Sequence, residues 1–170
     1  MYDDVMSLTT RPLVAFLQLN HRGTNLGCLH IRLDGLPGYV QQYQELATGS
    51  SGRGSYRGAR FDIIGNNGEP GERVGCCGFM NVAGARESAA IRQVEDYGSV
   101  STPVTEGVVF GAPGQHAGFG IITQGSSNTW TWPVIGHVTS GMSDLKAAVA
   151  KYDAEDILFT ETGVIFDARD

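Results

Sequence analysis

Apolar and polar residues alternate along two stretches near the start of the chain. Residues 13–19 and 26–33 are rich in apolar side chains, and in the second stretch Leu29, Ile31 and Leu33 alternate with Cys28, His30 and Arg32. A period of two is typical of a strand with one buried face. A turn-prone segment at 20–25 separates the stretches, so they are predicted to form an antiparallel hairpin.

A period of three to four residues, typical of a helix with one buried face, occurs twice. The first helix is predicted to start at Pro37 and to stop at Gly49, and the second covers 143–152 with Ser143 as its N-cap. The predicted apolar faces consist of Val40, Tyr43, Leu46 and Ala47 in the first helix, and of Met142, Leu145, Val149 and Tyr152 in the second.

Short runs rich in β-branched residues predict further strands at 60–64, 107–110, 118–123, 133–138 and 164–166. The segments 65–78 and 81–105 show no period and are predicted to be loops, with a helical turn at 87–92 as the alternative in the second. The order of elements predicts a mainly β fold, a closed antiparallel barrel with a helix packed at each end. Its buried residues should include Leu29, Ile31, Leu33, Ile121 and Val164.

The composition and net charge indicate the number of domains, the expected partners and the expected location. The 170 residues are 41% hydrophobic and 18% charged, which predicts one folded domain over 11–170 behind a polar leader at 1–10. A net charge of -6 argues against nucleic acid as a partner of the domain by itself. Without a long apolar run or a signal-peptide pattern, we expect no membrane association and an intracellular location, in the cytoplasm or the nucleus.

Sequence patterns for catalysis or cofactor binding are missing. The chain lacks a P-loop, a G-x-S-x-G elbow, an H-E-x-x-H helix and a dinucleotide fingerprint, so no cofactor is expected. The four histidines fall on separate segments, and we expect no metal site. Cys28 and the adjacent pair Cys76 and Cys77 lack zinc-ligand spacing, and the pair is predicted to be redox-inert, with no effect of reductant on thermal stability.

Two tryptophans are the strongest candidates for binding. Trp130 and Trp132 point the same way if the chain is extended there, and tryptophan is enriched among binding hot spots. The alternative is that both rings only anchor the core or a loop.

Several segments, in the same order, resemble the cyclophilins, which are eight-stranded antiparallel barrels capped by two helices and which isomerise X-Pro bonds. The likeness spans nearly the whole chain. The matching segments are 43–49 with its Leu-x-Thr-Gly end, the Gly-rich 52–58 with Phe61, the strand 119–123, the segment 134–142 with its Gly-Met end, and the last strand 163–167.

The positions that carry catalysis in this family differ here. The arginine that binds the substrate carbonyl is matched by Ile63, and the aromatic floor of the proline pocket is matched by Gly120. The pocket tryptophan is matched by Trp130, while Trp132 stands in place of a histidine. The family's Gln-Gly-Gly-Asp has no convincing match in 65–78. If the geometry is kept, arginine at 63 and phenylalanine at 120 would restore some activity.

The resemblance and these losses predict a catalytically inactive cyclophilin-like domain, a pseudo-isomerase within a larger multidomain protein. Its function would be to bind a protein or peptide partner in a groove, with no acceleration of X-Pro exchange and weakened binding of cyclosporin-type ligands. The predicted groove residues are Phe61, Ile63, Phe119, Gly120, Trp130 and Trp132. The alternatives are a divergent active prolyl isomerase that relies on other groups, and a structural subunit of an assembly. The sequence leaves the partner and the oligomeric state open.

Overall fold

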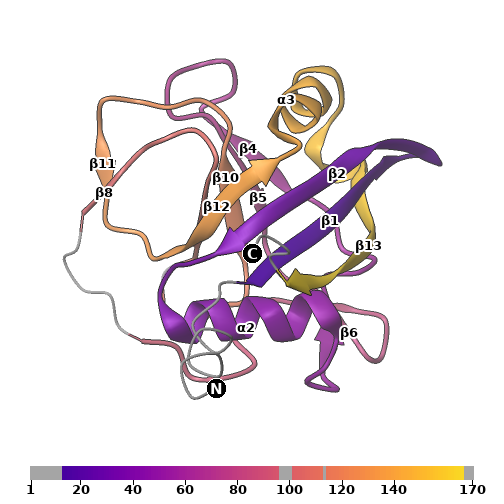
Figure 1. Cartoon of the computed structure of the whole chain (residues 1–170). Helices are drawn as coiled ribbons and strands as arrows, with labels where there is room; N and C mark the ends of the chain where they lie inside the picture. The colour runs from indigo at the N-terminus through magenta and orange to yellow at the C-terminus, as the bar shows by residue number, and fades with distance from the viewer. Residues whose placement is uncertain (1–12, 96–100, 113, 167–170) are drawn as a thin grey trace, which may run out of the picture.

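The computed structural model describes residues 13–95, 101–112 and 114–166, and it is mainly β with two α-helices (Figure 1). One antiparallel sheet of eight strands runs in the order β13-β1-β2-β12-β9-β10-β5-β4. The strands of this sheet are β1 (Leu13–His21), β2 (Thr24–Leu33), β4 (Ile63–Gly65), β5 (Arg73–Cys76), β9 (Val108–Gly111), β10 (Phe119–Ile122), β12 (Val134–Ser140) and β13 (Ile157–Phe166). The remaining elements are α2 (Pro37–Thr48), α3 (Met142–Lys151), the 3-10 turn η1 (Ala154–Asp156), and the short strands β3 (Gly54–Ser55), β6 (Phe79–Asn81), β7 (Arg86–Glu87), β8 (Thr102–Pro103) and β11 (Thr129–Trp130).

The predicted hairpin is confirmed as β1 and β2. Arg22 and Gly23 form its turn with positive φ angles of 48° and 91°. Leu17 lies opposite Leu29 and Ala15 opposite Ile31, and all four side chains are fully buried. Side chains opposite each other share a face, so the alternation seen in the sequence becomes the core face of this hairpin.

The first predicted helix is also confirmed. Pro37 occupies its first turn, and Gly49 ends it in the left-handed conformation with φ 75°. The N-cap residue offers no side-chain hydrogen bond; instead both carboxylate oxygens of Glu95 accept from the Gly38 amide, at 2.7 and 2.9 Å. This contact fixes the segment before residue 96 to the start of α2.

The second helix begins one residue earlier than predicted. Gly141, not Ser143, is the N-cap residue, and no side chain caps the helix. The backbone at Gly141 has φ 96°, and a Cβ there would lie 2.4 Å from the Cys28 carbonyl oxygen. Both the conformation and this close approach to β2 require glycine, so the turn between β12 and α3 is set by Gly141.

The eight-stranded antiparallel sheet is confirmed, whereas full closure of the barrel is not. The sheet curls into a half-barrel whose edge strands are β13 and β4. The segment just before β4 connects these edges: Gly58 donates to the Phe159 carbonyl at 2.7 Å, Phe61 donates to the Ile157 carbonyl at 3.1 Å, and Arg60 and Leu158 form an isolated bridge.

Burial agrees with the predicted core at four of five positions. Leu29, Ile31, Leu33 and Ile121 are buried, whereas Val164 is only half-buried. Among the described residues, the helices are too short and too polar to cross a membrane.

The segment 65–78 is not the continuous loop that was predicted, because it contains β5. Val74 and Cys76 are buried, whereas Arg73 and Gly75 between them are half-buried. The period of two is therefore present, but a glycine and a charged residue occupy its second face, and this hid the strand in the sequence. β5 lies between β4 and β10.

Candidate functional site

The candidate site lies on the outer face of four neighbouring strands, β4, β5, β10 and β9. Ile63 pairs with Gly75, Gly75 with Gly120, and Gly120 with Phe110. Because opposite residues in antiparallel strands project to the same side, these four residues form one row across the sheet. The alternate residues Val74, Ile121 and Val109 project to the other side and are fully buried in the core.

The two middle residues of this row are glycines and have no side chains. The side chains of Phe110 and Ile63, at the two ends of the row, lie close to the glycine backbone. A Cβ on Gly120 would lie 2.4 Å from Cζ of Phe110, so the phenylalanine ring lies over the Gly120 backbone. A Cβ on Gly75 would lie 3.2 Å from Cγ1 of Ile63, whose side chain is 56% exposed.

Three aromatic rings gather at the Phe110 end of the row. The ring centroids of Phe110 and Trp132 are 4.6 Å apart, those of Phe110 and Trp130 are 5.9 Å apart, and the two indoles are 5.2 Å apart. These three residues are called the aromatic cluster below. Phe110 is buried and both tryptophans are half-buried, so the indoles present part of their surface to solvent.

A guanidinium group lies against the aromatic cluster. Arg73 on β5 pairs with Gly65 on β4 and with Ile122 on β10, in the next row of the same face. Its Cζ is 4.8 Å from the Trp130 ring centroid and 5.8 Å from that of Trp132. A Cβ on Gly65 would lie 2.8 Å from the same Cζ, so the guanidinium packs between the β4 backbone and Trp130. A cation over an indole face is attracted by the ring quadrupole.

Four of the six predicted groove residues meet on this face, and two do not. Ile63, Gly120, Trp130 and Trp132 lie together as described. Phe61 and Phe119 are buried, with 0% and 3% of their surface exposed, so they do not line an accessible groove. They belong to the inner face, where Phe61 packs edge-on against Phe159 at 4.8 Å and supports the strands from beneath. Partner binding by the other four stays a prediction.

Sequence reasoning missed Phe110 and Arg73. Phe110 falls in a run of apolar residues that gives no indication of which one faces outward. Arg73 falls in the segment that was predicted to be a loop. The aromatic floor inferred to be missing at Gly120 is therefore replaced in space by the ring of Phe110, a residue of the neighbouring strand.

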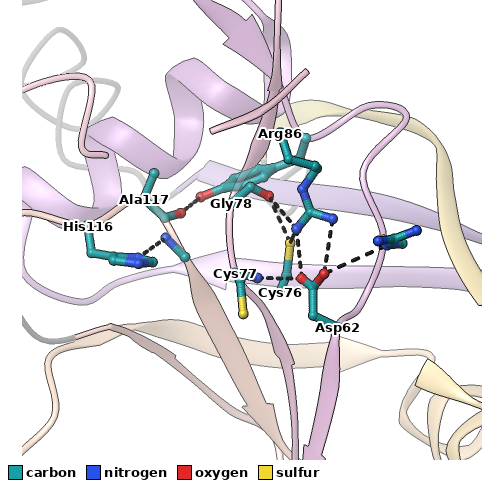
Figure 2. A network of polar contacts seen from close by, with 10 residues as sticks. Asp62, Cys76, Cys77, Gly78, Arg86, His116 and Ala117 are labelled. Carbon is teal, nitrogen blue, oxygen red and sulfur yellow. Dashed lines mark hydrogen bonds and ion pairs between the residues drawn. The ribbon is translucent and has the colours of Figure 1, made fainter. Parts of the chain in front are cut away.

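A network of polar contacts fixes the end of β5 next to this face (Figure 2). The Asp62 carboxylate binds the Arg86 guanidinium through two hydrogen bonds of 3.1 and 2.7 Å, and it accepts the Cys77 amide at 2.7 Å. Arg86 also donates to the Gly78 carbonyl at 3.4 Å. The Asp62 and Arg86 side chains are 20% and 27% exposed, so the pair is largely desolvated and is expected to stabilise the fold.

The two adjacent cysteines of this network have different surroundings. Cys76 is buried and donates its thiol proton to the Gly78 carbonyl at 3.1 Å, whereas Cys77 is exposed; both are free thiols. Burial raises the pKa of Cys76 to about 12. The pKa of Cys77 is also raised, first by desolvation and then by the negative charge of Asp62. High thiol pKa values disfavour the thiolate, which is the reactive form.

We expect Asp62→Ala to lower the free energy of unfolding by about 2–4 kcal/mol, because it leaves the Arg86 charge and the Cys77 amide without their acceptor. Urea denaturation measures this loss. Arg60→Gln is the matched control, since Arg60 lies 3.7 Å from the same carboxylate and is 48% exposed, and should change stability by less than about 0.5 kcal/mol. Equal effects of the two substitutions would contradict this role for the Asp62–Arg86 pair.

Comparisons with known proteins support the fold. No protein-family model and no curated protein matches the sequence. Among solved structures, the crystal structure of the Mimivirus cyclophilin is similar, with 14% sequence identity, a TM-score of 0.62, and 94% of each chain covered. At this level of identity the likeness concerns the fold.

The prediction that the chain is not an enzyme is wrong in the light of this likeness. The fold over 94% of the chain is that of a cyclophilin, whose usual activity is prolyl isomerisation. That prediction rested on the family side chains missing at Ile63, Gly120 and Trp132 and on the unmatched Gln-Gly-Gly-Asp, which sequence positions alone can show. In the structure the Phe110 ring lies over Gly120 and the Arg73 guanidinium lies beside Trp130. Over the residues that the structure describes, the chain is thus a mainly β domain with the cyclophilin fold, a curled eight-stranded antiparallel sheet with two helices.

Proposed function

We propose that this chain is a divergent prolyl cis-trans isomerase that binds proline-containing segments of a protein partner on the outer face of β4, β5, β10 and β9. The observation that carries the proposal is the Phe110 ring over Gly120, with Trp132 packed against it at 4.6 Å. In the family that the chain resembles, an aromatic floor matched to Gly120 packs against the substrate proline. Phe110 occupies that place from the neighbouring strand, and because its own ring is only 5% exposed, the half-buried indoles packed on it present the accessible aromatic surface.

Physical chemistry supports binding at this surface. The two indoles and Ile63 present apolar area to solvent around two glycines. A proline ring and the tryptophan faces both lose contact with water when they pack, and aromatic side chains contribute much of the free energy of such contacts. The cluster is already packed through Phe110, so little ordering is needed on binding.

Catalysis requires that the site favour the twisted amide over both planar forms. Twisting removes the amide resonance and with it part of the polarity of the C–N bond. A partly desolvated, apolar site therefore disfavours the planar ground state more than the twisted one. A barrier lowered by about 1–3 kcal/mol would accelerate the exchange roughly 5- to 150-fold.

Trp132→Ala tests where the substrate binds. We expect this variant to weaken binding of a blocked Ala-Ala-Pro-Ala peptide, followed by NMR shifts of the peptide, by about tenfold, because it removes the ring that packs against Phe110. The cis/trans exchange rate measured at the same protein concentration should fall with it.

The control is Val82→Ala, which truncates an exposed apolar side chain in the turn after β6 and should leave both quantities unchanged. Unchanged binding in Trp132→Ala, with its fold intact by circular dichroism, would contradict the proposed location of the site.

A further inference from the structure

We infer that Arg73 selects substrates with an anionic side chain next to the proline, an inference that rests on the proposed function. Its guanidinium is the charged group in contact with the aromatic cluster, 4.8 Å from the Trp130 centroid and 5.8 Å from the Trp132 centroid. Neighbouring Cα atoms in a peptide are 3.8 Å apart. A proline packed on the indoles therefore brings the side chain one position away within reach of Arg73.

Arg73 differs from Arg86 and Arg92 in its partners. Arg86 and Arg92 each contact a carboxylate at 2.7 Å. For Arg73, the hydrogen bond found within the described residues is a long one of 3.5 Å to the Gly71 carbonyl, and none of the carboxylates described lies within ion-pair distance. Most of its five N–H donors therefore have no acceptor among the described residues.

This guanidinium already lies against the aromatic cluster without a ligand. It packs between the Gly65 backbone and the Trp130 ring, and a side chain at 65 would collide with it. A stacked guanidinium keeps its planar edge free for a carboxylate or a phosphate, and it is more weakly hydrated than an ammonium group. Charge-assisted hydrogen bonds to such an anion are about twice as strong as neutral ones.

The test compares blocked Ala-X-Pro-Ala peptides in which X is Glu, Gln, Lys or phosphoserine. Both tryptophans of the chain lie in the aromatic cluster, so intrinsic fluorescence reports directly on binding there. We expect the Glu and phosphoserine peptides to bind about tenfold more tightly than the Gln peptide, and the Lys peptide to bind least tightly. If the phosphoserine peptide binds more tightly than the Gln peptide but the Glu peptide does not, the anion that Arg73 selects is a phosphate.

Arg73→Gln should remove the preference for Glu over Gln, so the ratio of the two affinities is the quantity measured. Arg57→Gln is the matched control, because it makes the same change of charge at an exposed ion pair with Glu161 and should keep the full preference. The peptide series is measured on the unaltered protein, so it tests the inference even if Arg73→Gln fails to fold.

Two results separate this inference from the function it rests on. Equal affinities of the Glu, Gln and Lys peptides would overturn selection by Arg73 and leave the proposed function intact. Failure of all four peptides to change the fluorescence or to be isomerised would overturn the proposed function, and the inference with it.

Discussion

A Gly120→Phe variant will be less stable than the natural chain and will not gain activity. The sequence comparison suggests the opposite, since phenylalanine at this position would restore the aromatic floor of the family that the chain resembles. In the structure, however, a single Cβ at 120 would already lie 2.4 Å from Phe110, which is 5% exposed and packed against both indoles. Overpacking of this kind costs about 1–3 kcal/mol, and a whole ring belongs at the upper end.

Thermal unfolding measures this effect, and about 3 kcal/mol corresponds to a midpoint lower by roughly 6–12 °C for a chain of this size. Combining Gly120→Phe with Phe110→Ala moves the ring from β9 to β10 and should recover most of the loss. Gly75→Ala is a milder control, because the closest neighbour of its Cβ would be the exposed Ile63 side chain at 3.2 Å. A Gly120→Phe variant as stable as the natural chain would show that the Phe110 ring does not fill this space.

The protein will lose stability steeply above pH 9. The buried Cys76 thiol has a pKa of about 12, against an ordinary value of 9.0. Between these values the unfolded chain releases the proton while the folded chain keeps it, so the free energy of unfolding falls as the pH rises. The contribution is fully present below pH 9 and is lost toward pH 12, by about 1.4 kcal/mol per pH unit and roughly 4 kcal/mol in total.

Urea midpoints at pH 8, 9 and 10 measure this loss; the raised pKa values of Cys28 and Cys77 add to it in the same window, so the comparison with Cys76→Ala separates the contribution of Cys76. Burial also raises the pKa values of Tyr43 and Tyr56 well above 10, so the tyrosines add their own loss only at higher pH. In Cys76→Ala the stability should be lower at pH 8 but should fall by about 1 kcal/mol less between pH 9 and 10. An equally steep fall in the variant would contradict the assignment to Cys76.

The elements that follow local rules could be predicted from the sequence. The β1–β2 hairpin has alternating apolar residues, and α2 has proline at its start and glycine at its end. The start of α3 could not be predicted, because Gly141 is required by the approach of the Cys28 carbonyl from another strand.

Only part of the candidate site could be predicted from the sequence. A family resemblance compares position with position, so it identified the losses at Ile63 and Gly120 but not the ring that Phe110 brings from the neighbouring strand. Arg73 on β5 and Trp130 on β11 are 57 positions apart, belong to different sheets, and meet only in the folded chain. Contacts of this kind depend on strand pairing, which the alternation of residues within one strand does not encode.

The most direct test of the account is the rate at which the natural chain interconverts the cis and trans forms of a blocked Ala-Ala-Pro-Ala peptide, measured by exchange NMR. The uncatalysed process takes tens to hundreds of seconds. The account predicts that tens of micromolar protein accelerates the exchange at least about fivefold, and that Trp132→Ala loses most of this acceleration. An exchange rate equal to that of the peptide alone, with the protein folded and in excess, would contradict the proposal that this chain is a prolyl isomerase.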